Sequence, residues 1–249
     1  MTDTDFINLF NVRISNICAP DLLTYIRQKV EEKKKVNITY VNANSFNLLF
    51  ELKELRFLLS NFDLLHPDGI GVYLASKFLY GKEGLKKRIT GSDFYPLLAR
   101  EAIKNNWSMF FLGDKDYTLN KIIRNYHKLN ISGLQNGYNI MDDRVIEKIN
   151  HSCPDILIVG LGCPKQEEWI TKYKDQLNAT VILAVGDGIK VFAGTKVRGF
   201  RIIRALGLEW FVRLLKNPVK LWKRYIAGIP IFAYRITKYK FSKNVPTSI

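Results

Sequence analysis

The sequence predicts an α/β protein: a parallel sheet with helices on both faces, followed by a basic, mostly helical C-terminal appendage. Three observations support this prediction. Apolar runs with strand character alternate with stretches of helical spacing, the strand runs are continuously apolar, and the composition changes abruptly after Gly194. Strands that are apolar at every position are typical of parallel sheets, because their crossover helices bury both faces.

The strand candidates are all short. They are VNITYV (36–41), FDLL (62–65), SMFFLG (108–113), DILIVGLG (155–162) and TVILAVGDG (180–188). Helical spacing of apolar residues marks the stretches 45–59, 69–80, 93–104, 117–128, 143–150 and 164–177. All of these stretches lie between two strand candidates, as parallel strands joined by crossover helices require.

Polar and glycine-rich residues follow four of the predicted strands. The stretches are NANS (42–45), HPDG (66–69), GLGCPKQE (160–167) and GDG (186–188). Ligands of open parallel sheets bind beyond the carboxyl ends of the strands. We therefore expect the functional residues in these stretches.

The composition is that of an ordinary globular protein, with 47% hydrophobic and 24% charged residues. The N-terminal stretch MTDTDFINLF lacks the features of a secretory signal, and no run reaches the roughly 18 apolar residues that span a bilayer. Three cysteines, Cys18, Cys153 and Cys163, lack metal-ligand spacing. We expect a cytoplasmic protein without a disulfide framework, a metal site or a cofactor.

The positive charge is concentrated near the C-terminus. The net charge is +15, and residues 195–249 carry 13 lysines and arginines against one acid, Glu209, which is a net +12. Aromatic residues are interleaved with these cations, as in helices that lie in a membrane interface; an apolar stripe that packs on the core is the alternative. We divide the chain into a core (1–194) and a basic aromatic appendage (195–249) with a polyanionic partner, either phospholipid or nucleic acid.

The stretch GLGCPKQEEWI (160–170) predicts a sharp turn between a strand and a helix. Pro164 starts the helix, whose first N–H groups can hold an anion. The stretch is not a dinucleotide fingerprint, since Lys165 occupies the position of the third small residue. No G-x-x-x-x-G-K-[ST] string occurs in the chain. NAD binding through such a fingerprint and P-loop hydrolysis are therefore not supported.

Two further residues are candidates for chemistry. Asp68, in HPDG, lies at a strand end just before a helix, where a carboxylate can accept a proton from a substrate hydroxyl. A helix N-cap or turn aspartate is the alternative. Arg88, in KKRITGSD, can bind a diphosphate in bidentate fashion; as one basic residue in a run of three, it is more often a solvated surface charge.

Six motifs together resemble those of the WecB/TagA/CpsF glycosyltransferase family. In order, they are VNANSFNLL (41–49), PDGIGV (67–72), RITGSDFY (88–95), GLGCPKQEEWI (160–170), VFAG (191–194) and GLEWFVRLLKNP (207–218). They span nearly the whole chain, and the combination of G-x-G-x-P-K-Q-E with G-L-E-W-x-x-R-L is highly specific. The members are bacterial enzymes that transfer a sugar from a nucleotide donor to a lipid-diphosphate-linked sugar.

The resemblance implies a Rossmann-like core that carries out inverting, metal-independent transfer of a hexosyl group, such as N-acetylmannosamine, in surface polysaccharide or teichoic acid assembly. The family's catalytic residues fall on Asp68, the base, on Arg88, which contacts the diphosphate, and on Gln166. Expected substrate-binding residues are Asn42, Gly137, Tyr138, Arg213, Lys220 and Lys223. The expected partners are a UDP-linked sugar donor, a polyprenyl-diphosphate-linked sugar acceptor and, through 195–249, the inner face of the cell membrane; a homo-oligomer stays open.

Four positions depart from the family pattern. A threonine that many relatives place two residues before the asparagine of the first motif is Tyr40. The double glycine after the last strand is Gly186-Asp187, the F-D pair is Ile189-Lys190, and R-A-P is replaced by R-G-F (198–200). Because an acid that helps to bind the donor is here a cation, the donor sugar stays open between N-acetylmannosamine, a hexuronic acid and another hexose.

Two other functions fit part of the sequence. A basic nucleic-acid-binding protein would explain the appendage but gives no purpose to the polar strand ends. A catalytically inactive family member would explain Tyr40 and Lys190, but Asp68 and Arg88 are both retained. We expect an enzyme, and no nucleic-acid partner.

Overall fold

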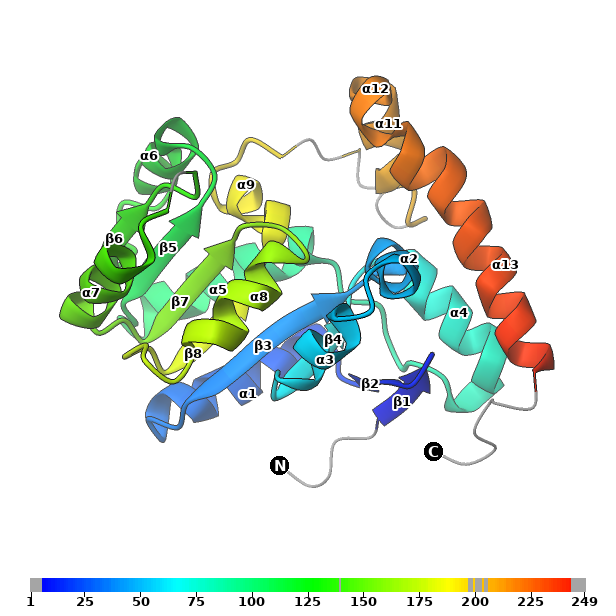
Figure 1. Cartoon of the computed structure of the whole chain (residues 1–249). Helices are drawn as coiled ribbons and strands as arrows, with labels where there is room; N and C mark the ends of the chain where they lie inside the picture. Colours follow the sequence, from blue (N-terminus) through cyan, green and yellow to red (C-terminus); the bar gives the residue numbers. More distant parts are fainter. Residues whose placement is uncertain (1–5, 139, 197–198, 200–202, 204–205, 243–249) are drawn as a thin grey trace.

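Figure 1 shows the computed structural model, which describes residues 6–138, 140–196, 199, 203 and 206–242. A six-stranded sheet has the order β4-β3-β8-β7-β5-β6. Its strands are β3 (Val36–Val41), β4 (Leu64–Pro67), β5 (Met109–Gly113), β6 (Ile131–Gln135), β7 (Ile156–Gly160) and β8 (Val181–Ala184). Every neighbouring pair is parallel, so the predicted fold class is confirmed.

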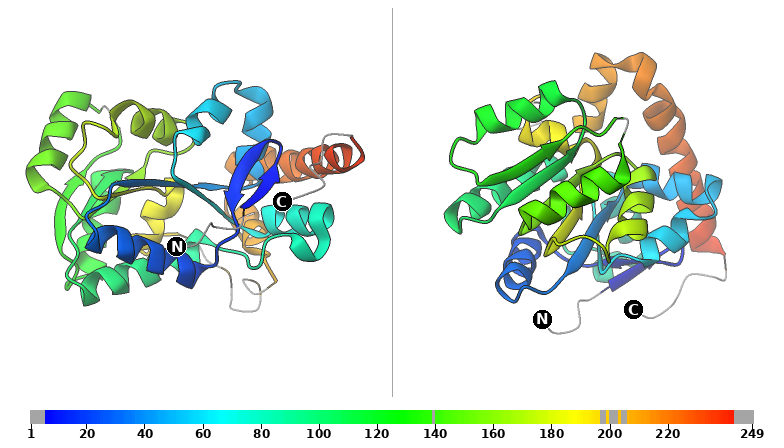
Figure 2. Two further views of the ribbon diagram at one scale, coloured as in Figure 1. Left: turned by 90° about the horizontal axis from the view of Figure 1, so that it is seen from below. Right: turned by 60° about the vertical axis from the view of Figure 1, so that its left-hand side comes forward.

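Helices cover both faces of this sheet, as Figure 1 and Figure 2 show. One face carries α1 (Ala19–Glu31), α5 (Gly91–Lys104), α6 (Asp116–Asn125) and α9 (Ile189–Phe192). The other carries α2 (Ala43–Glu51), α3 (Leu55–Ser60), α4 (Ile70–Tyr80), α7 (Asp142–Ser152) and α8 (Lys165–Tyr173). Along β7, Ile156 and Ile158 pack into the first layer and Leu157 and Val159 into the second. This strand is apolar at every position because both of its faces are buried.

Several elements lie outside the predicted ones. They include α1, the edge strand β6 and a hairpin of β1 (Phe6–Leu9) and β2 (Val12–Ser15). The sequence of β6 has no strong apolar pattern, and the strand is partly exposed at every position because it has only one neighbour in the sheet. The predicted helix 45–59 is the pair α2 and α3. The end of the predicted strand 180–188 is instead the 3₁₀ turn η2 (Gly186–Gly188); a second such turn, η1 (Gly81–Glu83), follows α4.

The chain after Gly194 continues into a helical arm. We call residues 206–242 the arm; its elements are α11 (Glu209–Lys216), α12 (Pro218–Trp222), the π-helical turn η3 (Lys223–Ala227) and α13 (Gly228–Phe241). Both views show α13 alongside α2 and α4. Phe232 and Ile236 of α13 are buried in the same cluster as Phe46 of α2. The apolar side of α13 therefore packs on the core.

The other half of the arm leaves large apolar side chains in solvent. Those with 46–89% exposure are Phe211, Leu215, Val219, Trp222 and Ile226. Within the described ranges, no helix has the length and apolarity needed to cross a membrane. Arg198 and Phe200 of the R-G-F stretch, and residues 1–5 of the N-terminal stretch, lie outside the described residues. The division of the chain at residue 194 stays a prediction.

Candidate active site

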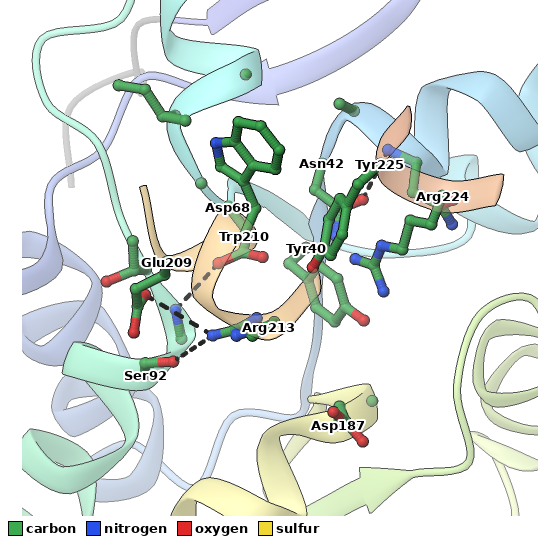
Figure 3. Close-up of a pocket in the computed structure, with 18 of the residues that line it drawn as sticks. Tyr40, Asn42, Asp68, Ser92, Asp187, Glu209, Trp210, Arg213, Arg224 and Tyr225 are labelled. Atoms are coloured by element: carbon green, nitrogen blue, oxygen red, sulfur yellow. Dashed lines mark hydrogen bonds and ion pairs between the residues drawn. The ribbon is translucent and has the colours of Figure 1, made fainter. Parts of the chain in front are cut away.

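A cavity of about 750 Å³ lies at the carboxyl ends of the sheet strands, between the core and the arm. Residues that follow β3, β4, β7 and β8 line it, including Asn42, Asp68, Gly162 and Asp187. From the arm come Glu209, Trp210, Arg213, Lys220, Arg224 and Tyr225. Figure 3 shows side chains of both origins around the same space. The polar strand ends expected to form a site thus belong to one cavity, which the arm completes.

Asp68 follows β4 and lines the cavity. Its Oδ1 accepts the backbone N–H of Gly91, the first residue of α5, at 3.0 Å. The Gly69 N–H donates to the Ile89 carbonyl at 2.9 Å, so the backbone on both sides of the carboxylate is held. The N-cap residue of α4 is Gly69, and no side chain caps that helix. Asp68 is therefore not a cap of the helix that it precedes, and its carboxylate is held in a fixed place in the wall.

Three buried aromatic side chains near Asp68 are uncharged. Burial lowers the pKa of His66 and raises the pKa of both Tyr40 and Tyr95; the charge of Asp68 adds to the rise for the two phenols. Each of the three is neutral at pH 7 as a result. Tyr40 and Tyr95 line the cavity, whereas His66 is fully buried. Asp68 therefore has three neutral aromatic neighbours, besides the cation Lys196.

Arg88 and Arg213 lie where the core meets the arm. Arg213 Nη2 donates to Ser92 Oγ at 3.0 Å and pairs with Glu209 at 3.7 Å, as Figure 3 shows. Gly207 has a φ of +75°, and a Cβ there would lie only 2.6 Å from Nη1 of Arg88. Only glycine accepts both this backbone conformation and this approach without strain. Gly207, the first residue of the GLEW motif, thus lets the arm pack directly against Arg88.

The remaining expected substrate-binding residues divide into two groups. Asn42 caps α2 by accepting the N–H groups of Asn44 and Ser45, each at 3.0 Å, and it lines the cavity together with Lys220. Lys223 lies outside the lining, with its ammonium 5.8 Å from the centroid of the Trp222 ring.

Gly137 and Tyr138 lie in the loop after β6, outside the cavity lining. The Gly137 N–H donates to the Asp114 carbonyl at 2.9 Å, and Tyr138 is 57% exposed. Asp114 in turn lies 3.8 Å from the ammonium of Lys190, which does line the cavity. The loop thus borders the cavity on the β5 side, and its predicted contact with the nucleotide stays a prediction.

Gln166 is completely buried beneath the cavity rather than in its lining. Its Oε1 accepts the Gly186 N–H at 2.8 Å, and its Nε2 donates to Glu167 Oε1 at 2.8 Å. Glu167 Oε1 also accepts the hydroxyl of Thr39 at 2.9 Å. The glutamine therefore ties the start of α8 to the turn η2, which carries Asp187 to the cavity.

Glu167 is the buried acid of this network, only 1% exposed. Burial raises the pKa of its carboxyl, although hydrogen bonds from Gln166 and Thr39 oppose the rise. Its Oε2 is one of the buried oxygens without a hydrogen-bond partner among the described residues. A buried ionised oxygen without a hydrogen-bond donor costs more free energy than a buried hydroxyl without an acceptor. Burial therefore favours the neutral acid.

Lys190 is the cation at the position where the family pattern has an acid. Its ammonium lies 2.8 Å from Asp187 Oδ1 and 3.8 Å from Asp114 Oδ2. Burial alone would raise the pKa of Asp187, but Lys196, Lys190 and Arg213 together hold it below the usual range. The two carboxylates therefore neutralise Lys190, and this cation does not by itself offer a site for an acidic sugar.

Several cavity residues were not among those expected to bind substrate. They are Tyr40, Asp187, Lys190, Lys196, Glu209, Trp210, Arg224 and Tyr225. Glu209 and Trp210 belong to the GLEW motif, which was a usable signal. Lys196 and Arg224 carry no local pattern, since each is one cation among many in a basic segment. Within the described residues, no three His, Cys, Asp or Glu side chains are grouped to hold a metal ion.

The motifs that meet at the cavity match a known family. The model of the Glycosyl transferase WecG/TagA/CpsF family matches residues 7–246, which is nearly the whole chain. The chain belongs to this family. The expectation of an enzyme, a glycosyltransferase, is confirmed with it.

Curated relatives agree over most of their length. A protein of Bacillus spizizenii (strain ATCC 23059 / NRRL B-14472 / W23) is 34% identical over 194 residues, covering 76% of this chain and 74% of the relative. One of Staphylococcus aureus (strain MW2) is 29% identical over 247 residues, covering 96% and 95% respectively. Both relatives are named N-acetylglucosaminyldiphosphoundecaprenol N-acetyl-beta-D-mannosaminyltransferase.

Proposed function

We propose that this protein transfers a hexosyl group from a nucleotide-diphosphate donor to a sugar carried on a polyprenyl diphosphate, with inversion and without a metal ion. The observation that carries the proposal is the cavity itself. It combines a held carboxylate, Asp68, with a group of cations supplied by both the core and the arm. A group transfer between two diphosphate-bearing substrates needs both features.

Asp68 is the proposed general base. The acceptor hydroxyl loses its proton to the Asp68 carboxylate while its oxygen attacks the anomeric carbon of the donor sugar. The bond between that carbon and the diphosphate oxygen breaks on the opposite face, and the electron pair leaves with the nucleoside diphosphate. A single displacement of this kind inverts the anomeric configuration, and the proton later passes from Asp68 to water.

The leaving diphosphate gains negative charge as its bond to the sugar breaks. Positioned cations lower the energy of such a transition state because they need no reorganisation when the charge develops. Arg88, Arg213 and Arg224 line the cavity, and each has a guanidinium suited to phosphate oxygens. We assign the stabilisation of the leaving group to these arginines in place of a metal ion.

The acceptor class follows from the relatives. Their names specify an N-acetylglucosaminyldiphosphoundecaprenol acceptor and an N-acetylmannosaminyl donor group. We carry over the polyprenyl-diphosphate-linked sugar and a UDP-linked hexose donor. Because Asp187 and Asp114 neutralise Lys190, we favour an uncharged sugar such as N-acetylmannosamine over a hexuronic acid.

A lipid-linked acceptor requires the cavity to reach a membrane surface. The exposed apolar side chains of α11, α12 and η3 alternate with Lys216, Lys220, Lys223 and Arg224, and the cavity opens between these elements and the core. We propose that this half of the arm binds the anionic inner face of the cell membrane peripherally. The packing of α13 on the core would hold the arm in place.

The direct test offers the purified protein a short-chain polyprenyl-diphosphate-sugar acceptor and a panel of nucleotide sugars, with products read by mass. We expect one UDP-hexose to be used, and Asp68→Asn to lower turnover by at least about 100-fold, the usual effect of losing a general base. Asn can still accept the Gly91 N–H, so the fold should persist. Asp143→Asn, an exposed aspartate at the start of α7, is the matched control.

Near-normal turnover of Asp68→Asn would exclude this residue as the base. No product from the wild-type protein with any donor would favour the inactive alternative. Flotation with anionic liposomes tests the membrane proposal separately: tight, salt-dependent DNA binding without liposome recovery would favour the nucleic-acid alternative instead.

A further inference from the structure

Lys196 is a cavity-lining cation that belongs to none of the family-like motifs. It directly follows α9 and its turn, where the N–H groups of Thr195 and Lys196 both donate to the Lys190 carbonyl, at 2.9 and 3.0 Å. This pair of hydrogen bonds to one acceptor fixes the backbone at the point where the side chain enters the cavity. The backbone of Lys196 is thus held by the segment around α9, and not by the arm.

Charged groups from four elements face Lys196. They are Asp68 after β4, Asp187 of η2, Arg213 of α11 and Arg224 of η3, and all of them line the same cavity. No hydrogen bond or ion pair to another described residue holds the ammonium. Lys190 differs in this respect, because Asp187 and Asp114 pair with it directly. Lys196 is therefore a cavity-lining cation whose charge the protein only partly compensates.

The balance of charge around the cavity points to a polyanion. Among the described residues, six cationic side chains line it, against the three carboxylates of Asp68, Asp187 and Glu209; the cations are Arg88, Lys190, Lys196, Arg213, Lys220 and Arg224. The burial of Lys196 and the nearby charge of Arg213 lower the pKa of its amine to about 8. An anion bound beside Lys196 would relieve both effects, since it stabilises the ammonium form.

We propose that Lys196 is a diphosphate-binding residue of this enzyme, whose ammonium contacts phosphate oxygens together with Arg213. The inference rests on the proposed function for the identity of the two diphosphate carriers, the nucleotide-sugar donor and the polyprenyl-linked acceptor. The chemistry on the protein side is the same for both carriers. The experiment below distinguishes them.

The test measures dissociation constants by titration calorimetry for UDP and for farnesyl diphosphate, using the full-length protein. Four proteins are compared: wild type, Lys196→Met, Lys196→Arg and the control Lys53→Met, which removes an exposed lysine after α2. We expect Lys196→Met to weaken at least one of the two ligands by about 10- to 100-fold, the range for loss of a hydrogen bond to a charged group. Lys196→Arg should retain most of the affinity, and Lys53→Met all of it.

The pH dependence supplies a readout that a merely structural lysine would not give. Binding by the wild type should weaken as pH rises above about 8, by up to about tenfold per pH unit, because the free protein loses the ammonium that the anion needs. Lys196→Arg should not show this loss, since guanidinium stays protonated. Of the groups that face Lys196, Asp187 has a pKa that is shifted downward, away from this range.

Weaker binding of UDP alone would place Lys196 on the donor, and weaker binding of farnesyl diphosphate alone would place it on the acceptor. Unchanged affinity of Lys196→Met for both ligands, with its thermal midpoint equal to that of the wild type, would overturn the proposal. In that case sugar transfer by the wild type would leave the proposed function standing. Conversely, diphosphate binding that depends on Lys196, without transfer of any sugar, would support the role of Lys196 and contradict the proposed function.

Discussion

Replacement of Gln166 by methionine tests how the glutamine of the PKQE motif contributes to the enzyme. Methionine has a similar length but can neither accept the Gly186 N–H nor donate to Glu167. Both hydrogen bonds are 2.8 Å long, and the glutamine is fully buried. The variant therefore separates a structural support from a group that touches the substrate.

The expected loss of stability can be worked from these two bonds. A buried N–H left without an acceptor costs about 1–3 kcal/mol, and the lost bond to Glu167 adds about 1 kcal/mol. Glu167 keeps the hydroxyl of Thr39, which limits the second contribution. We expect the free energy of unfolding to fall by about 2–4 kcal/mol, and the melting temperature by about 2–4 °C for each kcal/mol.

The assay is urea unfolding followed by tryptophan fluorescence, together with steady-state kinetics of sugar transfer. Because Gln166 holds the turn that carries Asp187, we also expect the KM for the donor to rise more than kcat falls. Gln176→Met, at an exposed glutamine after α8, should stay within about 0.5 kcal/mol of the wild type. Loss of transfer with an unchanged unfolding midpoint would refute the supporting role and indicate direct contact with substrate.

Two further substitutions test other parts of the site. Gly207→Ala places a Cβ against Arg88 and Ile70 at a φ of +75°, so we expect α11 to shift and kcat/KM to fall by about tenfold or more. Leu206→Ala, at the exposed neighbouring residue, is the control and should have little effect. Equal kcat/KM values for the two variants would contradict the close approach of Gly207 to Arg88. Glu167→Gln should change the pH dependence of stability. Because the pKa of the Glu167 carboxyl is raised on folding, the wild type loses stability as the pH rises through the pKa of this carboxyl in the folded protein. The variant has no carboxyl at this position and does not lose this stability. The difference in unfolding free energy between variant and wild type should therefore shift in favour of Glu167→Gln between about pH 5 and pH 8, and an equal difference at both pH values would show that the acid is ionised throughout.

The fold class, and the edge of the sheet at which the site lies, could be predicted from the sequence. Continuous apolar runs such as DILIVGLG occur where a strand is buried on both faces, and β7 is such a strand. The carboxyl ends of parallel strands share one edge, so the order of strands and polar stretches along the chain is enough to place Asn42, Asp68 and Gly162 near one another. The family followed from motifs at these ends and in the arm, and it is confirmed.

Which side chains face the cavity depends on the tertiary structure. In sequence, Gln166 and Glu167 are two polar residues in the first turn of a predicted helix, and nothing local shows that they are buried. Their burial depends on hydrogen bonds to each other, to Thr39 and to Gly186. Lys196 shows the reverse: nothing in its local sequence separates it from the other cations of the basic segment. Periodicity reports only which side of an element is apolar, and not which element packs against it. Long-range packing, including that of α13 on α2 and α4, therefore brings the arm's arginines to the cavity that Asp68 lines, and no local pattern in the chain could specify this.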